Sequence, residues 1–504
     1  MMPVFASPLA QPAPGRRDVL ITTVLIVMMT LWHVALLRVD VPWQDDDAFQ
    51  YMSHARNIAL QRPYADTGYI FTARTAEIGP QRYPPGLPLL LAPIYLGFGF
   101  DSLKPYMVAG LLTTAAMLVV LGAWCRNGRP AVSSPAIVAI LLVSPEFTRA
   151  SELIIAEPLY LLFAMLGLYV VDRDDMRGGD TAMGSAVLAG LLIGLASITR
   201  TLGVALVLAI LLQTAVRLGR GWQRAAVSVA TSLVLSALGG LLTGGSAATD
   251  YSSGFWNYDW STPFRNVRLY AGDLALEFLV PIPGATGLGK IALLVFLGLI
   301  GIGVMKIWRE RNGPTVWECF VAWYLAIVLV WPFYQGIRFM LPILPWAVRT
   351  AWIGLTDASN RLTGRAAPLV RGLATAMILL LSVPGLAAEL RAANTPYPDG
   401  LSSPNVQEFL EFVTSRTDAR ARLIATRPRT IAMVTGRAVA GWPRDVDARI
   451  LFEHIREVGA THLVIDRWTS RDAPIEQLIG QPDFTFERVF SNERFTVFET
   501  AVTR

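Results

Sequence analysis

The sequence predicts an all-α polytopic membrane protein with about eleven transmembrane helices and a small C-terminal soluble α/β domain. Hydrophobic residues make up 53% of the 504 residues and charged residues only 16%, against about 25% charged residues in soluble domains. The apolar residues form blocks long enough to cross a bilayer as helices, and strand patterns occur only in the last part of the chain. This composition excludes an ordinary water-soluble enzyme. The chain also has no basic, aromatic-rich segment that would indicate nucleic-acid binding.

The first apolar block spans 19–37 and follows Arg16 and Arg17. It is longer than the core of a signal peptide and runs into an acidic segment without a small-residue cleavage site. We therefore expect a retained first span. Residues 1–18 are predicted to be cytoplasmic, because basic residues favour that side of the membrane.

Ten further apolar blocks follow along the chain. They lie near 105–124, 132–144, 157–171, 182–198, 201–216, 225–243, 287–305, 315–332, 339–355 and 368–388. When eleven spans are threaded alternately, the basic loops fall on the same side as the N-terminus. The count therefore agrees with the positive-inside tendency.

The apolar stretch 87–100 does not fit as another span. It contains two prolines, is only 14 residues long, and would place the basic loops outside if it were counted. We expect it to lie in the interface or to re-enter the membrane from outside. The membrane domain is then predicted over 19–391, with long external loops at about 39–104 and 244–286.

Residues 392–504 are predicted to form a periplasmic α/β domain, because eleven spans that begin inside end outside. The expected elements are helices over 406–415 and 446–458, strands over 422–426 and 462–466, and a hairpin within 484–499.

The first external loop begins with three adjacent carboxylates, Asp45, Asp46 and Asp47. Neighbouring carboxylates raise each other's pKa, so such a cluster is costly. It is either a solvated acidic loop, a cation site or a general base held at the membrane surface. An amphipathic helix that carries Tyr51 and Arg56 follows, and a rigid helix favours a functional role.

Further candidate residues lie near the outer ends of predicted spans. Glu157 stands where an unpaired carboxylate is costly, and Arg149 is one structural partner that would explain it. Arg200 and Arg338 either snorkel to lipid headgroups, the usual role, or grip a phosphate. The pair Arg82 and Tyr83 precedes two prolines and by itself indicates an ordinary loop-to-helix junction.

Five segments in order resemble the GT-C fold glycosyltransferases, most closely the branch with protein O-mannosyltransferases and bacterial lipid A aminoarabinose transferases. They read DDAFQYMSHARNIA, RYPPGLPLLLAPIYLGFG, IIAEPLYLL, SITRTLGVAL and GIRFMLPILP, and the resemblance covers roughly residues 19–350. It implies a GT-C fold in a bacterial inner membrane. It also implies that a sugar passes, with inversion, from a polyprenyl-phosphate donor to a hydroxyl or amine of a lipid, glycan or protein at the periplasmic face.

The resemblance also implies roles for single residues. The acidic start of the first loop would hold the catalytic base, with Asp47 favoured over Asp46. Glu157 matches an acidic position of the family in the second external loop and is a further catalytic candidate. Arg200 and Arg338 match cations near the lipid-linked phosphate and are candidates for substrate binding.

Other residues are predicted to contact the substrate. Tyr51, Arg56, Arg82 and Tyr83 are the remaining candidates for substrate binding. Aminoarabinose transferases have a lysine before the two prolines, where this chain has Tyr83, so the donor stays open. The resemblance requires no cofactor and no metal, although the Asp45–Asp47 cluster leaves a divalent cation open.

Two other functions compete with the transferase. A transporter or lipid flippase would use intramembrane charges to line a substrate path, but the chain has no detectable repeat and its charges gather on one side. A scaffold for envelope assembly would use the C-terminal domain and would be indifferent to Asp47→Asn.

Overall fold

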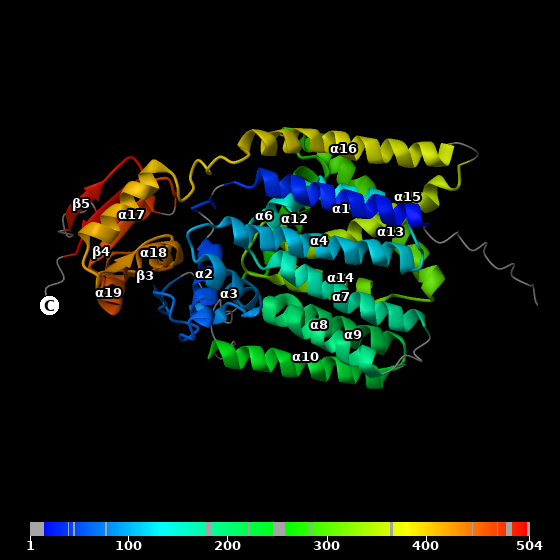
Figure 1. Cartoon of the computed structure of the whole chain (residues 1–504), viewed down its shortest axis with the longest axis horizontal. Helices are drawn as coiled ribbons and strands as arrows, with labels where there is room; N and C mark the ends of the chain where they lie inside the picture. Colours follow the sequence, from blue (N-terminus) through cyan, green and yellow to red (C-terminus); the bar gives the residue numbers. More distant parts are fainter. Residues whose placement is uncertain are drawn as a thin grey trace, which may run out of the picture.

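The computed structural model describes residues 15–38, 40–43, 46–75, 78–177, 183–219, 221–244, 258–282, 284–362, 366–445, 447–470, 472–479 and 486–500. Within these ranges the fold is mostly helical, as predicted. Long helices run side by side and form a bundle, and a smaller α/β unit lies beyond one end of it (Figure 1). Helices α2 (Asp46–Ala59) and α3 (Gly86–Phe98) lie between the two parts.

The bundle contains helices of very different lengths. Its helices are α1 (Arg16–Leu36), α4 (Lys104–Asn127), α5 (Ser134–Leu142), α6 (Pro145–Glu152), α7 (Glu157–Met176), α8 (Met183–Thr199), α9 (Val204–Val216), α10 (Trp222–Thr243), α12 (Thr262–Asp273), α13 (Thr286–Arg311), α14 (Val316–Val330), α15 (Leu344–Ser359) and α16 (Ala366–Ala392). Short turns η2 (Thr201–Gly203), η4 (Ile337–Phe339) and η5 (Leu341–Ile343) and the π-helix η3 (Leu274–Leu279) interrupt them.

Six segments among the described residues are long and apolar enough to cross a membrane. They are α1, α4, α10, α13, the segment Ile337–Ser359 and α16. Helices α6 and α7 form a further candidate that is bent by 106°, and α3, α8, η2 with α9, and α14 are shorter apolar helices. The chain therefore has the helices of a membrane protein, and the count of eleven spans stays a prediction.

Breaks in the apolar helices occur next to three of the predicted polar residues. Glu157 begins α7 after the sharp bend, Arg200 is extended between α8 and η2, and Arg338 lies in η4 before α15. Irregular backbone at membrane depth is tolerated where it lines a cavity or is buried in protein. The breaks in regular helix therefore allow the side chains of Glu157, Arg200 and Arg338 to approach one another.

The predicted first external loop, residues 39–104, forms α2 (Asp46–Ala59), β1 (Tyr69–Ile70), η1 (Pro80–Arg82) and α3 (Gly86–Phe98). Helix α3 is the short apolar stretch of the sequence and packs on α2 at the end of the bundle. It meets the end of α8 so closely that a Cβ on Gly86 would lie 2.4 Å from the Thr199 hydroxyl oxygen and 2.8 Å from its Cα. Only glycine fits there, and the contact holds the start of α3, which follows Tyr83, against the end of α8, which precedes Arg200.

The α/β unit is a mixed sheet with helices packed on it. Its helices are α17 (Pro404–Arg416), α18 (Pro428–Thr435), α19 (Ala448–Val458) and α20 (Ala473–Ile479). Its C-terminal strands are β2 (Arg422–Ile424), β3 (Ala438–Ala440), β4 (His462–Asp466), β5 (Glu487–Ser491) and β6 (Phe495–Glu499). The strand order is β1-β3-β2-β4-β6-β5; the first four strands are parallel, and β6 is antiparallel to both of its neighbours.

The sheet differs from the prediction in two respects: it contains strand β3, which was not predicted, and its edge strand β1 comes from the first external loop. Tyr69 and Ile70 pair in parallel with Val439 and Ala440. Trp43, also from that loop, is 1% exposed among the core residues of the α/β unit. A two-residue strand such as β1 has no sequence pattern of its own, so the joint structure was not predictable from hydrophobic spacing.

Candidate active site

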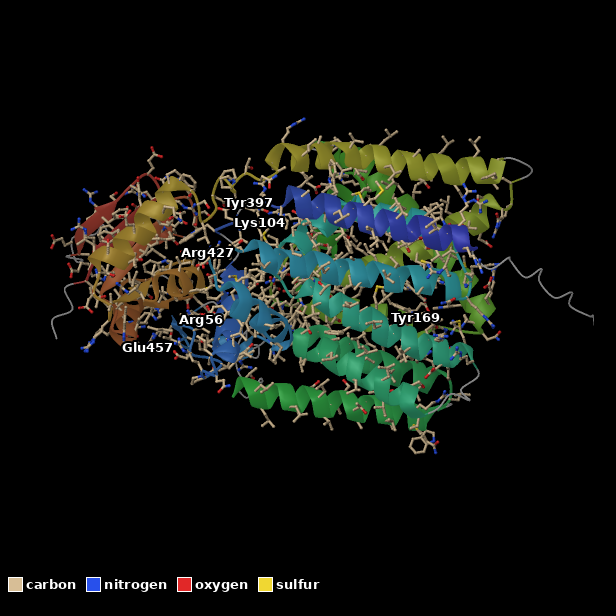
Figure 2. The ribbon with its side chains drawn as sticks, viewed as in Figure 1. Arg56, Lys104, Tyr169, Tyr397, Arg427 and Glu457 are labelled. Carbon is tan, nitrogen blue, oxygen red and sulfur yellow. The ribbon has the colours of Figure 1, made fainter. Side chains whose placement is uncertain are left out.

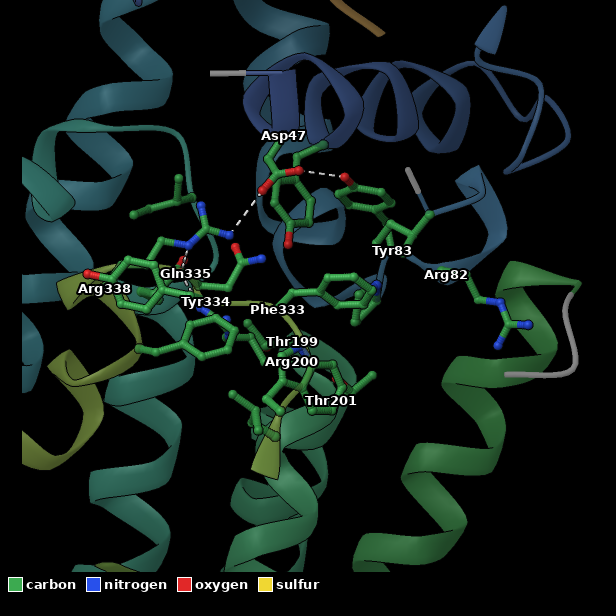
Figure 3. A pocket seen from close by; sticks show the side chains of 18 of the residues that line it. Asp47, Arg82, Tyr83, Thr199, Arg200, Thr201, Phe333, Tyr334, Gln335 and Arg338 are labelled. Carbon is green, nitrogen blue, oxygen red and sulfur yellow. Dashed lines mark hydrogen bonds and ion pairs between the residues drawn. The ribbon is translucent and has the colours of Figure 1, made fainter. Parts of the chain in front are cut away.

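A cavity of about 450 Å³ lies where the bundle, the first external loop and the α/β unit meet (Figure 3). Its described lining combines charged and aromatic side chains. The residues are Asp47, Tyr51, Ile78, Arg82, Tyr83, Pro84, Ile155, Glu157, Thr199, Arg200, Thr201, Leu202, Trp331, Phe333, Tyr334, Gln335, Arg338, Phe339 and Arg429. Small-molecule sites usually combine an apolar wall with a few convergent polar groups in this way.

Asp47 is held on both of its carboxylate oxygens. The Tyr83 hydroxyl donates to Oδ1 over 2.5 Å, and Nη1 of Arg429 donates to the same oxygen over 3.2 Å. Nη2 of Arg338 donates to Oδ2 over 3.1 Å (Figure 3). Helix α2 therefore presents Asp47 in one orientation, with Oδ2 toward the arginines of the bundle.

Glu157 links the two bundle arginines. It forms ion pairs with Arg200 and, over 3.3 Å, with Nε of Arg338, and its side chain is 4% exposed. The alternative that Arg149 is its structural partner is therefore wrong, because the bend before α7 brings Glu157 toward η2 and η4 instead. The guanidinium of Arg200 also lies 5.1 Å from the centre of the Phe339 ring.

Asp46 faces away from the cavity and binds the start of α18. Its Oδ1 accepts hydrogen bonds from the Thr430 backbone N–H over 2.8 Å and from the Thr430 hydroxyl over 2.9 Å. The first N–H groups of a helix have no partner within the helix, and the residue before α18, Arg427, provides no side-chain cap. Asp46 therefore caps a helix that lies far away in the sequence.

Arg429 is a cavity residue that the sequence analysis missed. It comes from α18 and lies 3.4 Å from Asp46 and 3.2 Å from Asp47. Its guanidinium lies over the rings of Tyr69 and Tyr83, 5.3 and 5.1 Å from their centres. Nothing in the surrounding segment resembles a motif, so no local signal in the sequence marks it.

The structure brings most of the predicted residues together, but not all. Tyr51 packs edge-on against Tyr83, with ring centres 5.2 Å apart, and Arg82 lines the cavity at some distance from the Asp47–Arg338 pair (Figure 3). Arg56 lies on α2 at the junction with the α/β unit and does not line the cavity (Figure 2). Asp45 lies outside the described residues.

Asp46 and Asp47 are neighbours on α2, but the protein shifts their pKa values in opposite directions. Burial raises the pKa of Asp46, and the charges of Arg429 and Arg427 and the Thr430 hydrogen bonds oppose it without cancelling it. Burial also raises the pKa of Asp47, but the charges of Arg338 and Arg429 and the Tyr83 hydrogen bond outweigh burial and lower it to about 2. Burial raises the pKa of Tyr83, so its phenol stays a donor. Asp47 is consequently an ionised acceptor.

The cavity carries more positive than negative charge. Four arginines line it, Arg82, Arg200, Arg338 and Arg429, against the carboxylates of Asp47 and Glu157. Arginine presents a planar set of donors that suits phosphate oxygens. Within the described ranges, no group of three or more His, Cys, Asp or Glu side chains is arranged to hold a metal ion.

This fold and site define the class of the protein. The described part of the chain has the GT-C fold, and the comparisons place it with glycosyltransferases of that fold. The resemblance to polyprenyl-phosphate-dependent enzymes that the five sequence segments indicate is thereby confirmed. The chain also has the apolar helices of a membrane protein.

The individual matches are distant in sequence. The model of Glycosyltransferase family 87 matches residues 82–332. The crystal structure of ArnT from Cupriavidus metallidurans bound to undecaprenyl phosphate matches with a TM-score of 0.59 and 12% identity, over 96% of this chain and 98% of that chain. The archaeal oligosaccharyltransferase AglB from Archaeoglobus fulgidus, in complex with an inhibitory peptide and a dolichol-phosphate, matches with a TM-score of 0.58 and 12% identity, over 90% of this chain and 70% of that chain. No curated protein matches the sequence.

Proposed function

We propose that this protein transfers a sugar from a polyprenyl-phosphate donor to an acceptor hydroxyl or amine at the periplasmic face of a bacterial inner membrane, with Asp47 as the general base. The observation that carries the proposal is one cavity lined by the Asp47 carboxylate, by Arg338, which is paired with it, and by Arg200. A base and a phosphate-binding group on opposite sides of a sugar are what a single displacement requires. The acceptor is a lipid, a glycan or a protein.

The donor phosphate fits the arginine side of the cavity. A polyprenyl tail stays in the bilayer, so its phosphate reaches the ends of the spanning helices, where Arg200 and Arg338 lie. The structural neighbours ArnT and AglB bind undecaprenyl phosphate and a dolichol-phosphate, which supports a lipid-linked donor. Glu157 contacts both arginines, so we assign it to the positioning of the phosphate-binding groups.

The proposed step is a direct displacement at the anomeric carbon. Oδ2 of Asp47 takes the proton of the acceptor hydroxyl while the acceptor oxygen bonds to the anomeric carbon. The bond from that carbon to the phosphate oxygen breaks, and its electron pair stays on the polyprenyl phosphate, which gains negative charge. The excess positive charge of the cavity stabilises this charge as it develops. Attack from the side opposite to the phosphate inverts the configuration.

Release of polyprenyl phosphate tests the proposal. Purified wild type, Asp47→Asn and a control, Asp101→Asn, are incubated with a panel of polyprenyl-phosphate sugars and a membrane extract as the source of acceptor. Asp101 is exposed and does not line the cavity. We expect release from one donor by wild type and control, and none by Asp47→Asn.

The competing functions predict different results. Equal release by Asp47→Asn would remove Asp47 from the mechanism. A transporter or lipid flippase would release no polyprenyl phosphate from any donor but would move substrate across the membrane of a proteoliposome.

A further inference from the structure

We propose that Arg429, which the C-terminal α/β unit provides, is a positioning residue for Asp47, so that this unit is a working part of the transferase site. The inference rests on the proposed function, because it concerns the group that acts as its base. Arg429 contacts the carboxylates of both Asp46 and Asp47. The sequence around Arg429 contains no motif that predicts such a role.

The two oxygens of Asp47 have different surroundings. Oδ1 accepts from two groups that belong to the protein framework, the Tyr83 hydroxyl and Arg429. Oδ2 accepts from Arg338, the residue that we assign to the donor phosphate. When a phosphate engages Arg338, Oδ2 becomes available to an acceptor while Oδ1 stays anchored. Arg429 and Tyr83 thus fix the plane of the carboxylate and leave one oxygen for the reaction.

Arg429 is itself held firmly enough to do this. Its side chain is 6% exposed, and its Nη2 donates to the backbone oxygen of Ile78 over 3.2 Å. The rings of Tyr69 and Tyr83 lie 5.3 and 5.1 Å from the guanidinium carbon, within the range of cation–π attraction. Reacting groups must be held within a fraction of an ångström, and a side chain with this many contacts has little freedom to move.

Docking of the α/β unit does not require Arg429. Strand β1 pairs with β3, Trp43 is buried among its core residues, and Asp46 caps α18. Arg74 of the first loop forms exposed ion pairs with Glu453 and Glu457 of α19. Because several other contacts join the two parts, the effect of Arg429 on catalysis is separable from its effect on docking.

Arg429→Gln, Arg429→Lys and the control Arg74→Gln test the inference. We expect Arg429→Gln to lower kcat at least tenfold and to leave the donor KM within about twofold, because the donor arginines remain. We expect Arg429→Lys to recover part of the activity, since it keeps the charge but not the planar set of donors. Arg74→Gln removes two interface ion pairs without touching Asp47 and should behave as wild type.

The pH profile distinguishes positioning from a structural role. The titratable or charged groups that face Asp47 are Arg338 from η4, Arg429 from α18, Tyr83 after η1 and Tyr51 from α2. Removing one positive charge raises the pKa of a neighbouring carboxylate. The acid-side decline of kcat/KM should therefore begin at higher pH in Arg429→Gln than in wild type, and Arg429→Lys should lie closer to wild type.

Four outcomes would overturn the inference. Wild-type kcat and pH profile in Arg429→Gln would show that Asp47 needs no partner from the α/β unit. Loss of thermal stabilisation by added undecaprenyl phosphate in this variant would make Arg429 a phosphate ligand instead. If Arg429→Gln does not fold, Arg429→Lys decides: a lowered kcat with an unchanged donor KM supports positioning, and wild-type kcat contradicts it. Absence of release by wild type would overturn the proposed function itself, and this inference with it.

Discussion

Asp46 and Asp47 are neighbours in sequence, yet the fold gives them different tasks. Consecutive residues of an α-helix point about 100° apart, so Asp46 faces α18 while Asp47 faces the cavity. Both oxygens of Asp46 already have partners: Oδ1 accepts from the Thr430 N–H and hydroxyl, and Oδ2 forms an ion pair with Arg429. Asp47 keeps one oxygen whose partner, Arg338, is also a candidate ligand for the donor. The fold thus separates a helix cap, Asp46, from the proposed base, Asp47.

Substitutions at Asp46 should affect stability more than activity. Asp46→Asn keeps an oxygen that can accept from Thr430, so we expect release of polyprenyl phosphate within a few-fold of wild type. Asp46→Ala removes the cap and should lower the free energy of unfolding by about 1 kcal/mol. Thermal melting and the release assay check both expectations. Loss of release in a well-folded Asp46→Asn would move the base to Asp46.

The pH dependence should differ between kcat/KM and kcat. In the free protein the charges of Arg338 and Arg429 and the Tyr83 hydrogen bond outweigh burial and lower the pKa of Asp47 to about 2, so the base stays ionised as the pH falls through the mildly acidic range. Bound donor phosphate would compensate the charge of Arg338 and raise that pKa. The acid limb of kcat, which reports the complex, should therefore lie at higher pH than that of kcat/KM. Coincident acid limbs would contradict this coupling.

At the scale of elements, breaks in the apolar helices determine which charged side chains reach the cavity. Arg200 and Arg338 would face lipid or neighbouring helices if α8, η2 and α9, or α14 and α15, were continuous. The interruptions at Thr201–Gly203 and Ile337–Phe339 turn both side chains into the cavity instead. A broken helix thus brings cations into the cavity without a long polar loop.

Arg338→Gln should weaken both donor binding and turnover. It removes one donor to the phosphate, and loss of a comparable electrostatic contact costs about 3 kcal/mol, or roughly a hundredfold in rate. We also expect undecaprenyl phosphate to stabilise this variant less against heat, since a ligand stabilises the folded state more the more tightly it binds. Arg268→Gln, an exposed residue on α12, is the matched control. Full thermal stabilisation in Arg338→Gln would place the phosphate elsewhere.

At the scale of the molecule, the first external loop and the C-terminal segment fold as one structure. Asp40 accepts hydrogen bonds from the backbone N–H groups of Tyr397 and Ser402, and Trp43 packs against Phe409 and Phe495 with ring centres 6.2 and 5.5 Å away. Helix α2 begins next to this joint between the loop and the C-terminal segment, and Asp47 lies in the first turn of the helix. The position of the catalytic candidate therefore depends on the α/β unit.

Trp43→Ala should loosen this joint. Truncation of a buried Trp costs about 3–5 kcal/mol, so we expect a lower melting temperature, faster proteolysis of residues 404–499 and reduced release of polyprenyl phosphate. Trp222→Ala is the control, because Trp222 is 62% exposed at the start of α10. Proteolysis at the wild-type rate would show that Trp43 does not anchor the unit.

Much of the site could be predicted from the sequence, because its signals are local. Glu157, Arg200 and Arg338 stand out as charges at the ends of apolar blocks, and Asp47 stands out within an acidic run. Tyr83 is part of a segment that resembles a known family. The observed helix Pro404–Arg416 and strand His462–Asp466 agree with the patterns in the C-terminal segment, whereas α18, β3 and α20 were missed because they are short.

The sequence by itself determined that the chain is a membrane protein of GT-C type and which charges lie near the ends of its helices. The length and hydrophobicity of a segment depend only on residues that are adjacent in the chain. They can therefore be recognised in the sequence without knowing which distant residues come into contact. Only the tertiary structure decided that Arg429 meets Asp47, 382 positions away, that Glu157 pairs with Arg200 and Arg338, and that β1 completes the sheet. These contacts arise from packing between distant segments, for which a single sequence carries no periodic signal.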